Sequence, residues 1–458
     1  MGRDLQWIAG SASRGGHLIA TIGFGFFGLV TLLGIAWLFS TNRQAIDWKL
    51  VGIGVTLQIV FAMLVLLVPG GRDVFDALGG VFVRLLDFTR EGSGFVFGDL
   101  MRSDKFGVIF AVQVLPTIIF FAALMGVLYH LGVMQAIVKG LAWVIMRVMR
   151  VSGAETTSVC ASIFIGQTEA PLTIRPYIAR MTQSELLTVM IGGMAHIAGG
   201  VLAAYVAMLG GNDPIEQAFY AKHLLTASVM AAPATIVIAK ILVPETGDPL
   251  TRGQVRMEVE RTTTGVIDAA AAGAGDGLRL ALNVGAMLLA FVALIALINS
   301  PLKWLGSIPW GASQITIDAW LTGVSGHPVT LSLQSLLGYV LSPIAWVIGV
   351  PWQDATIVGS LIGQKVVLNE FVAYIGLADI INGHAPGLTL SPQGTLIATY
   401  ALCGFANFSS IAIQIGGIGG LAPERRGDIA RFGMRAVLGG SIATFMTATI
   451  AGVLTQFG

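Results

Sequence analysis

Polar and ionisable side chains interrupt several long apolar stretches of this 458-residue sequence, and they are the residues with the most chemistry to offer. A polar group at membrane depth is costly unless it faces a partner or a cavity, so each one is a candidate for a binding site. Carboxylates accept hydrogen bonds, and amides both donate and accept them, so the set suits a neutral solute with adjacent hydroxyl groups, such as a ribose carrying a nucleobase. The candidates are Gln167, Thr168, Glu169, His196, Asn283, Gln364, Lys365, Asn369, Glu370, Asn407, Ser409 and Ser410.

Catalytic and cofactor motifs are missing from the sequence. It contains no metal-spaced His and Cys cluster, no nucleophile paired with a base, no Walker A motif and no HExxH motif. We therefore expect no cofactor and no ATP-driven pump, and an intramembrane enzyme that uses Glu169, His196 and Glu370 is a remote alternative. Cys160 and Cys403 lie in apolar or glycine-rich stretches, which predicts two packed, reduced thiols.

The scarcity of charge sets the class of protein. The chain has 26 Lys and Arg and 25 Asp and Glu, which is 11% of its residues, whereas 55% are hydrophobic. Soluble domains have about 25% charged residues. A disordered chain needs low hydrophobicity, and a nucleic-acid-binding protein needs a basic surface that a net charge of +1 does not supply. The composition predicts an all-α integral membrane protein whose surroundings are the lipid bilayer.

Eight apolar runs are long enough to cross the hydrocarbon core of a membrane. The first run exceeds the 7–15 residues of a signal-peptide core, so we expect a spanning helix there and no cleaved signal. Positive charges are spread over many loops, so the orientation in the membrane stays open. The runs are 18–39, 50–69, 107–131, 186–209, 223–243, 277–299, 394–419 and 432–457.

Other stretches do not read as simple spans. Residues 72–105 and 134–150 mix charges with apolar residues at amphipathic spacing, which predicts helices lying in the membrane interface. Residues 244–264 form the one strongly polar stretch, which predicts a solvated loop near the middle of the chain.

Two apolar segments, 157–178 and 352–375, are interrupted by Gly, Pro or charge. They contain the similar fragments SIFIGQT and SLIGQK, and a glycine-rich span follows each of them. Paired, interrupted segments in the two halves of a membrane protein predict re-entrant hairpins, inverted repeats and a binding site near the midplane. Chance similarity between Gly- and Ile-rich helices is the alternative.

Each polar candidate also has a structural explanation. Glu169 can cap the helix that follows it, which is compatible with ligand binding. Glu370 can pair with Lys365, although a spacing of five residues is poor for a helical pair. Hydrogen bonding between helices can explain four further polar residues, which are Asn283, Asn407, Ser409 and Ser410.

Several longer motifs resemble the concentrative nucleoside transporters, and the chain is identified as a bacterial member of that family. The resemblance covers most of the chain in one order. It rests on GQTEAPL (166–172), MTQSEL (181–186), IAGGVLAAY (197–205), LALNVGAML (280–288), NEFVAY (369–374), CGFANFSSIAI (403–413) and RRGDIAR (425–431).

The resemblance implies a homotrimer in the inner membrane, with eight spanning helices, two opposed re-entrant hairpins and an interfacial helix in each protomer. It implies a scaffold domain and a transport domain that moves as an elevator. The expected division is 1–150 as scaffold and interfacial helices, 151–243 as the first hairpin and following helices of the transport domain, 244–266 as the polar loop, 267–300 as a scaffold helix, and 301–458 as the second hairpin and C-terminal helices.

The resemblance also implies roles for individual residues in a nucleoside site. Nucleobase contacts are implied for Gln167 and Thr168, with an apolar wall from Val201, Leu280 and Phe405. Ribose contacts are implied for Glu169, Glu370, Asn407 and Ser410. Gln167 and Thr168 suit a purine or a pyrimidine edge, so the preferred nucleoside stays open.

The implied coupling-ion region is Ser162, Ile165, His196 and Ile197, and here the chain departs from the family pattern. Sodium-coupled members resemble this chain there but carry Asn and Ser where it has Ser162 and His196. Sodium prefers oxygen ligands, imidazole suits transition metals, and the unperturbed pKa of a histidine is about 6.5. We therefore predict proton-coupled nucleoside symport, through His196 with Glu169. Sodium coupling is the alternative, and a third interpretation is that His196 only packs between helices.

A passive channel is a remote alternative, because channels use pore-lining rings or filters, whereas two opposed, broken hairpins favour alternating access.

Overall fold

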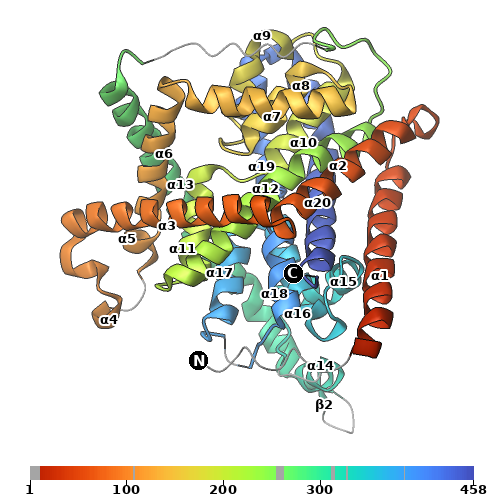
Figure 1. Cartoon of the computed structure of the whole chain (residues 1–458). Helices are drawn as coiled ribbons and strands as arrows, with labels where there is room; N and C mark the ends of the chain where they lie inside the picture. Colours follow the sequence, from red (N-terminus) through yellow and green to blue (C-terminus); the bar gives the residue numbers. More distant parts are fainter. Residues whose placement is uncertain are drawn as a thin grey trace.

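A computed structural model describes residues 11–106, 109–253, 263–310, 315–325, 329–385 and 387–457. Nearly all of the described chain is helical (Figure 1). Two short strands, β1 (Pro309–Trp310) and β2 (Ile315–Thr316), pair antiparallel beside α14 (Ile317–Ser325). The predicted all-α fold is confirmed.

Seven helical segments of the described residues are long and apolar enough to cross a membrane, or eight if one sharply bent pair counts as a span. They correspond to seven of the eight predicted runs, and most begin a few residues earlier or end later than predicted. The segments are α1 (Ser11–Leu38), α2 (Trp48–Leu66), α5 with α6 (Phe110–Gln113 and Leu115–His130), α10 with α11 (Gln183–Ala195 and Gly199–Gly210), α12 (Pro214–Leu242), α13 (Val266–Ser307) and η4 with α20 (Pro423–Arg425 and Arg426–Leu454).

The predicted continuous span over 394–419 is wrong. Two helices, α18 (Pro392–Ala401) and α19 (Phe408–Leu421), occupy this stretch, and residues 402–407 between them are not helical. Gly404 in this break has a φ of +119°, a region that favours glycine. Mean apolarity does not report such a break, because the unwound residues are as apolar as the helices around them.

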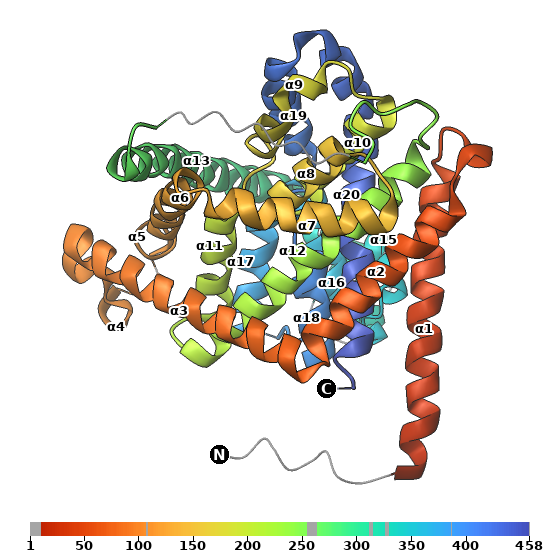
Figure 2. The ribbon, with the colours of Figure 1, turned by 45° about the horizontal axis from the view of Figure 1, so that its top comes forward.

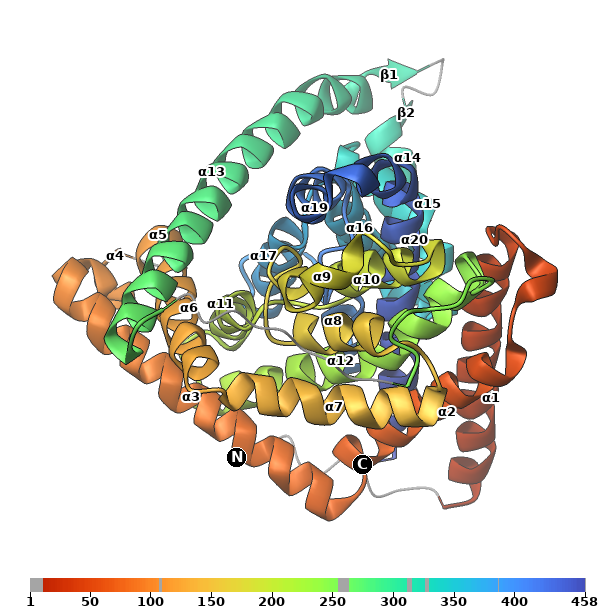
Figure 3. The ribbon, with the colours of Figure 1, turned by 90° about the horizontal axis from the view of Figure 1, so that it is seen from above.

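The predicted amphipathic stretches are helices that lie outside the central bundle. They are α3 (Pro69–Phe97) and α7 (Val133–Met149), and the former is followed by η2 (Gly98–Met101) and α4 (Ser103–Phe106). Figures 2 and 3 show α3, α7 and α13 along the outside and α1, which η1 (Arg43–Ala45) follows, at another edge, with α10, α16, α18 and α20 between them. Part of the predicted polar loop, 254–262, lies outside the described residues.

The first interrupted segment lies where the sequence predicts it. α8 (Gly153–Ser162) ends, residues 163–169 are not helical, and η3 (Ala170–Ile174) and α9 (Arg175–Ile178) follow. These elements lie near the top of Figure 1, whereas α16 (Trp352–Val367) and α17 (Glu370–Ile381) lie in its lower half.

The second interrupted segment also begins where the sequence predicts it, with α16 before a break and α17 after it, and a further helix, α15, precedes it. α15 (Leu333–Val347) and α16 (Trp352–Val367) are bent by 117° at residues 348–351, and α17 (Glu370–Ile381) begins after a further break at 368–369. The predicted segment 352–375 therefore begins at the first residue of α16 and ends six residues before the end of α17. The sequence signal misses α15 because its turn, Ile-Gly-Val-Pro, carries no charge or amide.

The same order of half-helices occurs twice along the chain. The first series is α8, a break, α9, α10, a break, α11 and α12; the second is α16, a break, α17, α18, a break, α19 and α20. This order favours a repeat over chance similarity between SIFIGQT and SLIGQK, because it extends over residues 153–242 in one half and 352–454 in the other.

Candidate functional site

The unwound stretches of the two halves lie against each other. The backbone N–H of Gly199 donates to the carbonyl oxygen of Phe164 over 2.9 Å, which joins the break after α8 to the break between α10 and α11. A Cβ at Gly404 would lie 2.7 Å from the carbonyl oxygen of Met194 at the end of α10. The breaks after α8, α10 and α18 therefore meet in one place.

Two asparagines begin half-helices at this place. The Asn369 side-chain oxygen accepts from the backbone N–H of Val372 over 3.0 Å and caps α17. The Asn407 side-chain oxygen accepts from the backbone N–H of Ser410 over 2.9 Å and caps α19. Such caps satisfy the free N–H groups of a helix start. The helices therefore start beside the polar candidates.

Glu370 is the central acceptor of the site and is only 3% exposed. Its carboxylate accepts from Asn407 Nδ2 over 2.8 Å and from the Tyr205 hydroxyl over 3.3 Å. The Tyr205 ring stacks on Tyr374 with centroids 4.2 Å apart. Tyr205 was not predicted, although a buried tyrosine in an apolar helix needs a partner for its hydroxyl, and that is a usable signal.

Gln167 joins the first hairpin to α19. Its Nε2 donates to the Ser410 hydroxyl over 3.1 Å, and its Oε1 accepts from Gln414 Nε2 over 3.2 Å. Gln414 Nε2 also donates to the Met190 carbonyl oxygen over 2.9 Å. Gln414, which was not predicted, holds the amide of Gln167 in a fixed orientation.

The other residues that are predicted to contact the nucleoside differ in how deeply they are buried. Thr168 packs against Gly417 of α19, where an added Cβ would lie 2.7 Å from the threonine methyl group. Val201 is buried in α11, Phe405 is half-buried in the α18–α19 break, and Glu169 is exposed.

Leu280 lies on the outer helix α13, is 39% exposed, and has no part in the hydrogen-bonded network of Gln167, Glu370, Asn407 and Ser410. The alternative ion pair of Glu370 with Lys365 is not formed, since no ion pair of Lys365 within 4.0 Å is found among the described residues.

The predicted coupling-ion residues lie at the first pair of breaks. The Ser162 hydroxyl donates to the Ser158 carbonyl oxygen over 3.0 Å and keeps its own lone pairs as acceptors. His196 is 1% exposed, and its Nδ1 lies 2.7 Å from the Gly192 carbonyl oxygen. A carbonyl only accepts, so Nδ1 carries the proton of this bond. The other ring nitrogen, Nε2, is buried without a partner in the described structure.

The carbonyl oxygens of Ile165 and Ile197 belong to the unwound backbone of these breaks. No hydrogen bond to either oxygen is found among the described residues. Carbonyls freed in this way are the groups that coordinate cations in broken membrane helices.

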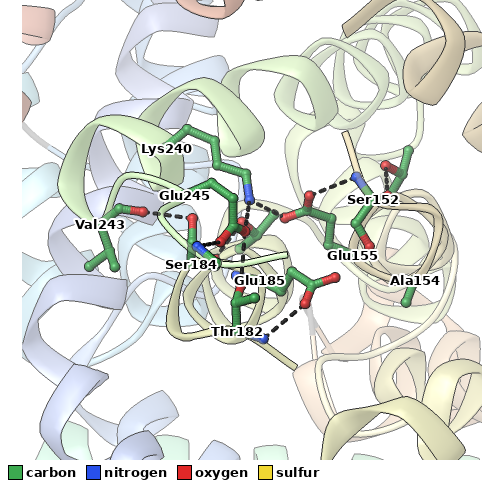
Figure 4. Close-up of polar contacts among 12 residues, drawn as sticks. Ser152, Ala154, Glu155, Thr182, Ser184, Glu185, Lys240, Val243 and Glu245 are labelled. Carbon is green, nitrogen blue, oxygen red and sulfur yellow. Dashed lines mark hydrogen bonds and ion pairs between the residues drawn. The ribbon is translucent and has the colours of Figure 1, made fainter. Parts of the chain in front are cut away.

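A buried charge cluster fixes the starts of α8 and α10 (Figure 4). Glu155 and Glu185 complete capping boxes at these two helix starts. Lys240, from the last turn of α12, lies 2.8 Å from the Glu155 carboxylate and 3.2 Å from that of Glu245. The Thr182 hydroxyl donates to Glu245 over 2.8 Å. The first hairpin is thus tied to α10, α12 and the loop after α12.

Three family models match the chain. They are described as the C-terminus of a Na⁺-dependent nucleoside transporter, over residues 223–452, its N-terminus, over 27–100, and a nucleoside recognition gate, over 111–212. The chain belongs to the concentrative nucleoside transporter family.

Relatives match this transporter over nearly its full length. An uncharacterized transporter of Haemophilus influenzae is 44% identical over 94% of this chain and 97% of its own length. Sodium/nucleoside cotransporter 1 of Mus musculus is 38% identical over 94% of this chain, which spans 63% of that longer protein.

Solved structures of CNTnw share the fold. An inward-facing, substrate-bound state aligns with a TM-score of 0.82 at 43% identity, over 96% of this chain and 99% of that one. A variant in an outward-facing state aligns with a TM-score of 0.85 at 43% identity, over 96% and 100% of the two chains. The transporter is a multi-pass membrane protein and not an enzyme. The described residues contain no group of three or more His, Cys, Asp or Glu placed to hold a metal ion.

Proposed function

We propose that this transporter moves nucleosides by sodium-coupled symport, with alternating access of an elevator type. The observation that carries the proposal is the buried network in which Gln167, Glu370, Asn407 and Ser410 meet at helix breaks inside an apolar bundle. Polar residues at membrane depth are rare and mark substrate pathways in membrane proteins. The matched family description and the name of the mouse relative both specify nucleosides and sodium.

The nucleoside is proposed to lie across the meeting point of the breaks. Glu370, Asn407 and Ser410, with Glu169 opposite, bind the ribose, because acceptors and amides together match its hydroxyl groups. The base lies against Gln167 and Thr168, with Val201 and Phe405 as apolar contacts. An apolar contact of the base with Leu280 of α13 belongs to the same proposal.

Sodium fits the first pair of breaks better than the predicted proton does. The carbonyl oxygens of Ile165 and Ile197 and the hydroxyl of Ser162 are oxygen ligands, which hard cations prefer. The imidazole of His196 is fixed by its bond to Gly192, which positions the unwound backbone of Ile197 next to it. One observation keeps proton coupling as a second candidate, namely the buried Nε2 of His196 without a partner in the described structure.

Uptake into proteoliposomes under separate gradients tests the coupling ion. With an imposed sodium gradient at equal pH on both sides, we expect uridine or adenosine to accumulate above equilibrium. A pH gradient without sodium is expected to give no accumulation, and accumulation under that condition alone would replace sodium by protons. Equilibration without accumulation under either gradient would mean a passive pathway. His196→Gln is the matched variant: it keeps sodium-driven uptake if sodium is the coupling ion and abolishes pH-driven uptake if the proton is.

The predicted assembly and division into domains belong to the same proposal. Outer helix α13 exposes several large apolar side chains in the single chain, among them Leu282, Leu289 and Leu297. Such a face suits either lipid or further copies of the chain. We propose a homotrimer in which residues 1–150 and 267–300 form the scaffold, and 151–243 and 301–458 form mainly the moving part. The mass of the purified complex tests the trimer.

A further inference from the structure

Lys365 is a cation enclosed in the second half of the transporter, and the nucleoside site does not account for it. Its side chain is 0% exposed. The ammonium donates to the Ala401 carbonyl oxygen over 2.9 Å and to the Thr444 hydroxyl over 3.2 Å, and it lies 6.0 Å from the centre of the Phe445 ring. A buried charge is retained only where groups of opposite polarity compensate its lost hydration.

The groups around this ammonium all present negative partial charge to it. Ala401 is the last residue of α18, and Lys365 itself stands in the last turn of α16, so the negative ends of two helix dipoles converge on it. The single hydroxyl proton of Thr444 is within reach of the carbonyl oxygens of Ser441 (3.0 Å) and Ala401 (3.3 Å), and a lone pair of the same hydroxyl accepts from the lysine. The aromatic ring adds a further electronegative face.

The position of Lys365 in the repeat is informative. In the first half, the ends of α8 and α10 present a neutral hydroxyl and free carbonyl oxygens, where the proposed sodium ion binds. In the second half, α16 and α18 hold the same places in the order of elements, and there the ammonium of Lys365 occupies the end of the second half-helix. In both halves a cation thus compensates the oxygen atoms at the helix ends. The first half takes a sodium ion from solution, and the second half uses the ammonium of Lys365.

The lysine also reaches both breaks that carry the ribose contacts. Lys365 precedes the break before Glu370, and Ala401 precedes the break that contains Asn407. The lysine bonds the helix ends in front of these breaks, and the 2.8 Å bond from Asn407 to Glu370 joins the residues behind them.

We propose that Lys365 is a positioning residue that acts as a tethered cation. It replaces, in the second half, the ion that the first half takes from solution, and it holds the breaks around Glu370 and Asn407 in their binding geometry. This inference rests on the proposed sodium-coupled function for the comparison of the two halves, but its test does not.

Chemical rescue tests the proposal. Lys365→Ala opens a space beside the Ala401 carbonyl, and Lys365→Met fills that space without a charge. Because hydrogen bonds from a charged group are lost, we expect both variants to lower nucleoside uptake by about tenfold or more. Ammonium or methylammonium is expected to restore uptake several-fold in Lys365→Ala, and neither is expected to act on wild type or on Lys365→Met. Absence of rescue in a folded Lys365→Ala, or wild-type uptake by Lys365→Met, overturns the proposal.

A second variant covers the case in which Lys365→Ala does not fold. Thr444→Val keeps the shape of the side chain and removes one acceptor of the ammonium. We expect it to weaken nucleoside binding several-fold in the wild-type background and to have no added effect in Lys365→Met. An unchanged affinity in the wild-type background would count against the proposal. Sodium dependence of wild-type uptake is measured in the same vesicles, so a failure of sodium coupling is seen separately from a failure of rescue.

Discussion

Removal of the Lys240 ammonium is expected to destabilise the first half of the transporter strongly. Lys240→Met keeps most of the side-chain volume and removes the charge that lies 2.8 Å from Glu155, whose side chain is 1% exposed. Breaking a buried ion pair by removal of one partner costs about 3–5 kcal/mol, because the other charge stays buried and uncompensated. Glu245, with its side chain 17% exposed, reaches water more easily and adds less to the cost.

The pairing itself can be separated from the loss of a side chain by a second substitution. In Lys240→Met with Glu155→Gln, no uncompensated charge remains at the pair, and the amide can still accept from the Ser152 backbone N–H. We expect this double variant to recover more than half of the lost free energy of unfolding. Equilibrium unfolding in detergent micelles, followed by tryptophan fluorescence, measures both variants, since the chain has 9 tryptophans.

A surface pair provides the control. Arg252 and Asp248 lie 3.7 Å apart with side chains 63% and 91% exposed, so Arg252→Met is expected to leave the free energy of unfolding unchanged within error. If Lys240→Met unfolds like wild type, or if the added Glu155→Gln recovers nothing, the cluster does not stabilise the helix starts in the way described.

Three further predictions concern the breaks. Glu370→Gln should raise the Kd for nucleosides by about 10- to 100-fold, because hydrogen bonds to a charge are worth about 1.5–3 kcal/mol. In a competition assay it should also reduce the preference for ribose over dideoxyribose. An unchanged Kd would remove Glu370 from the site. Gly404→Ala should abolish uptake without loss of the folded protein, since its Cβ would lie 2.7 Å from the Met194 carbonyl oxygen and its φ is +119°; normal uptake would show that the breaks need not touch. Ser162→Ala should raise the sodium concentration for half-maximal uptake while leaving nucleoside binding at saturating sodium intact, and an unchanged sodium dependence would exclude the hydroxyl as a ligand.

The sequence predicts the membrane class and most spanning helices, because the length of an apolar run has to match the thickness of the hydrocarbon core. It also predicts Gln167, Glu370, Asn407 and Ser410, which the structure joins by hydrogen bonds. These residues are visible because polar groups in apolar runs are rare.

Features that depend on distant contacts were not predicted. In the sequence, Gln414 is a single amide in a long apolar run. Its role in orienting the amide of Gln167 follows only from their contact across 247 residues of sequence. The break at 402–407 was not predicted, because its one strongly polar residue, Asn407, was explained by hydrogen bonding between helices and the other residues are apolar or glycine. The helix α15 was not predicted, because the bend that joins it to α16 carries no charge or amide.

The buried charges themselves follow a rule that could have located the breaks. Glu155, Glu185 and Glu370 each stand in the first turn of a helix, and Lys240 and Lys365 each stand in a last turn. Each charge thus lies at the helix end whose partial charge is opposite to its own, where it costs least in a medium of low polarity. Each of these five buried charges therefore marks the end of a helix, whereas Arg279, whose side chain is exposed, lies inside α13. By that rule Lys365 and Glu370 bracket a break, and the structure places one at residues 368–369 between them.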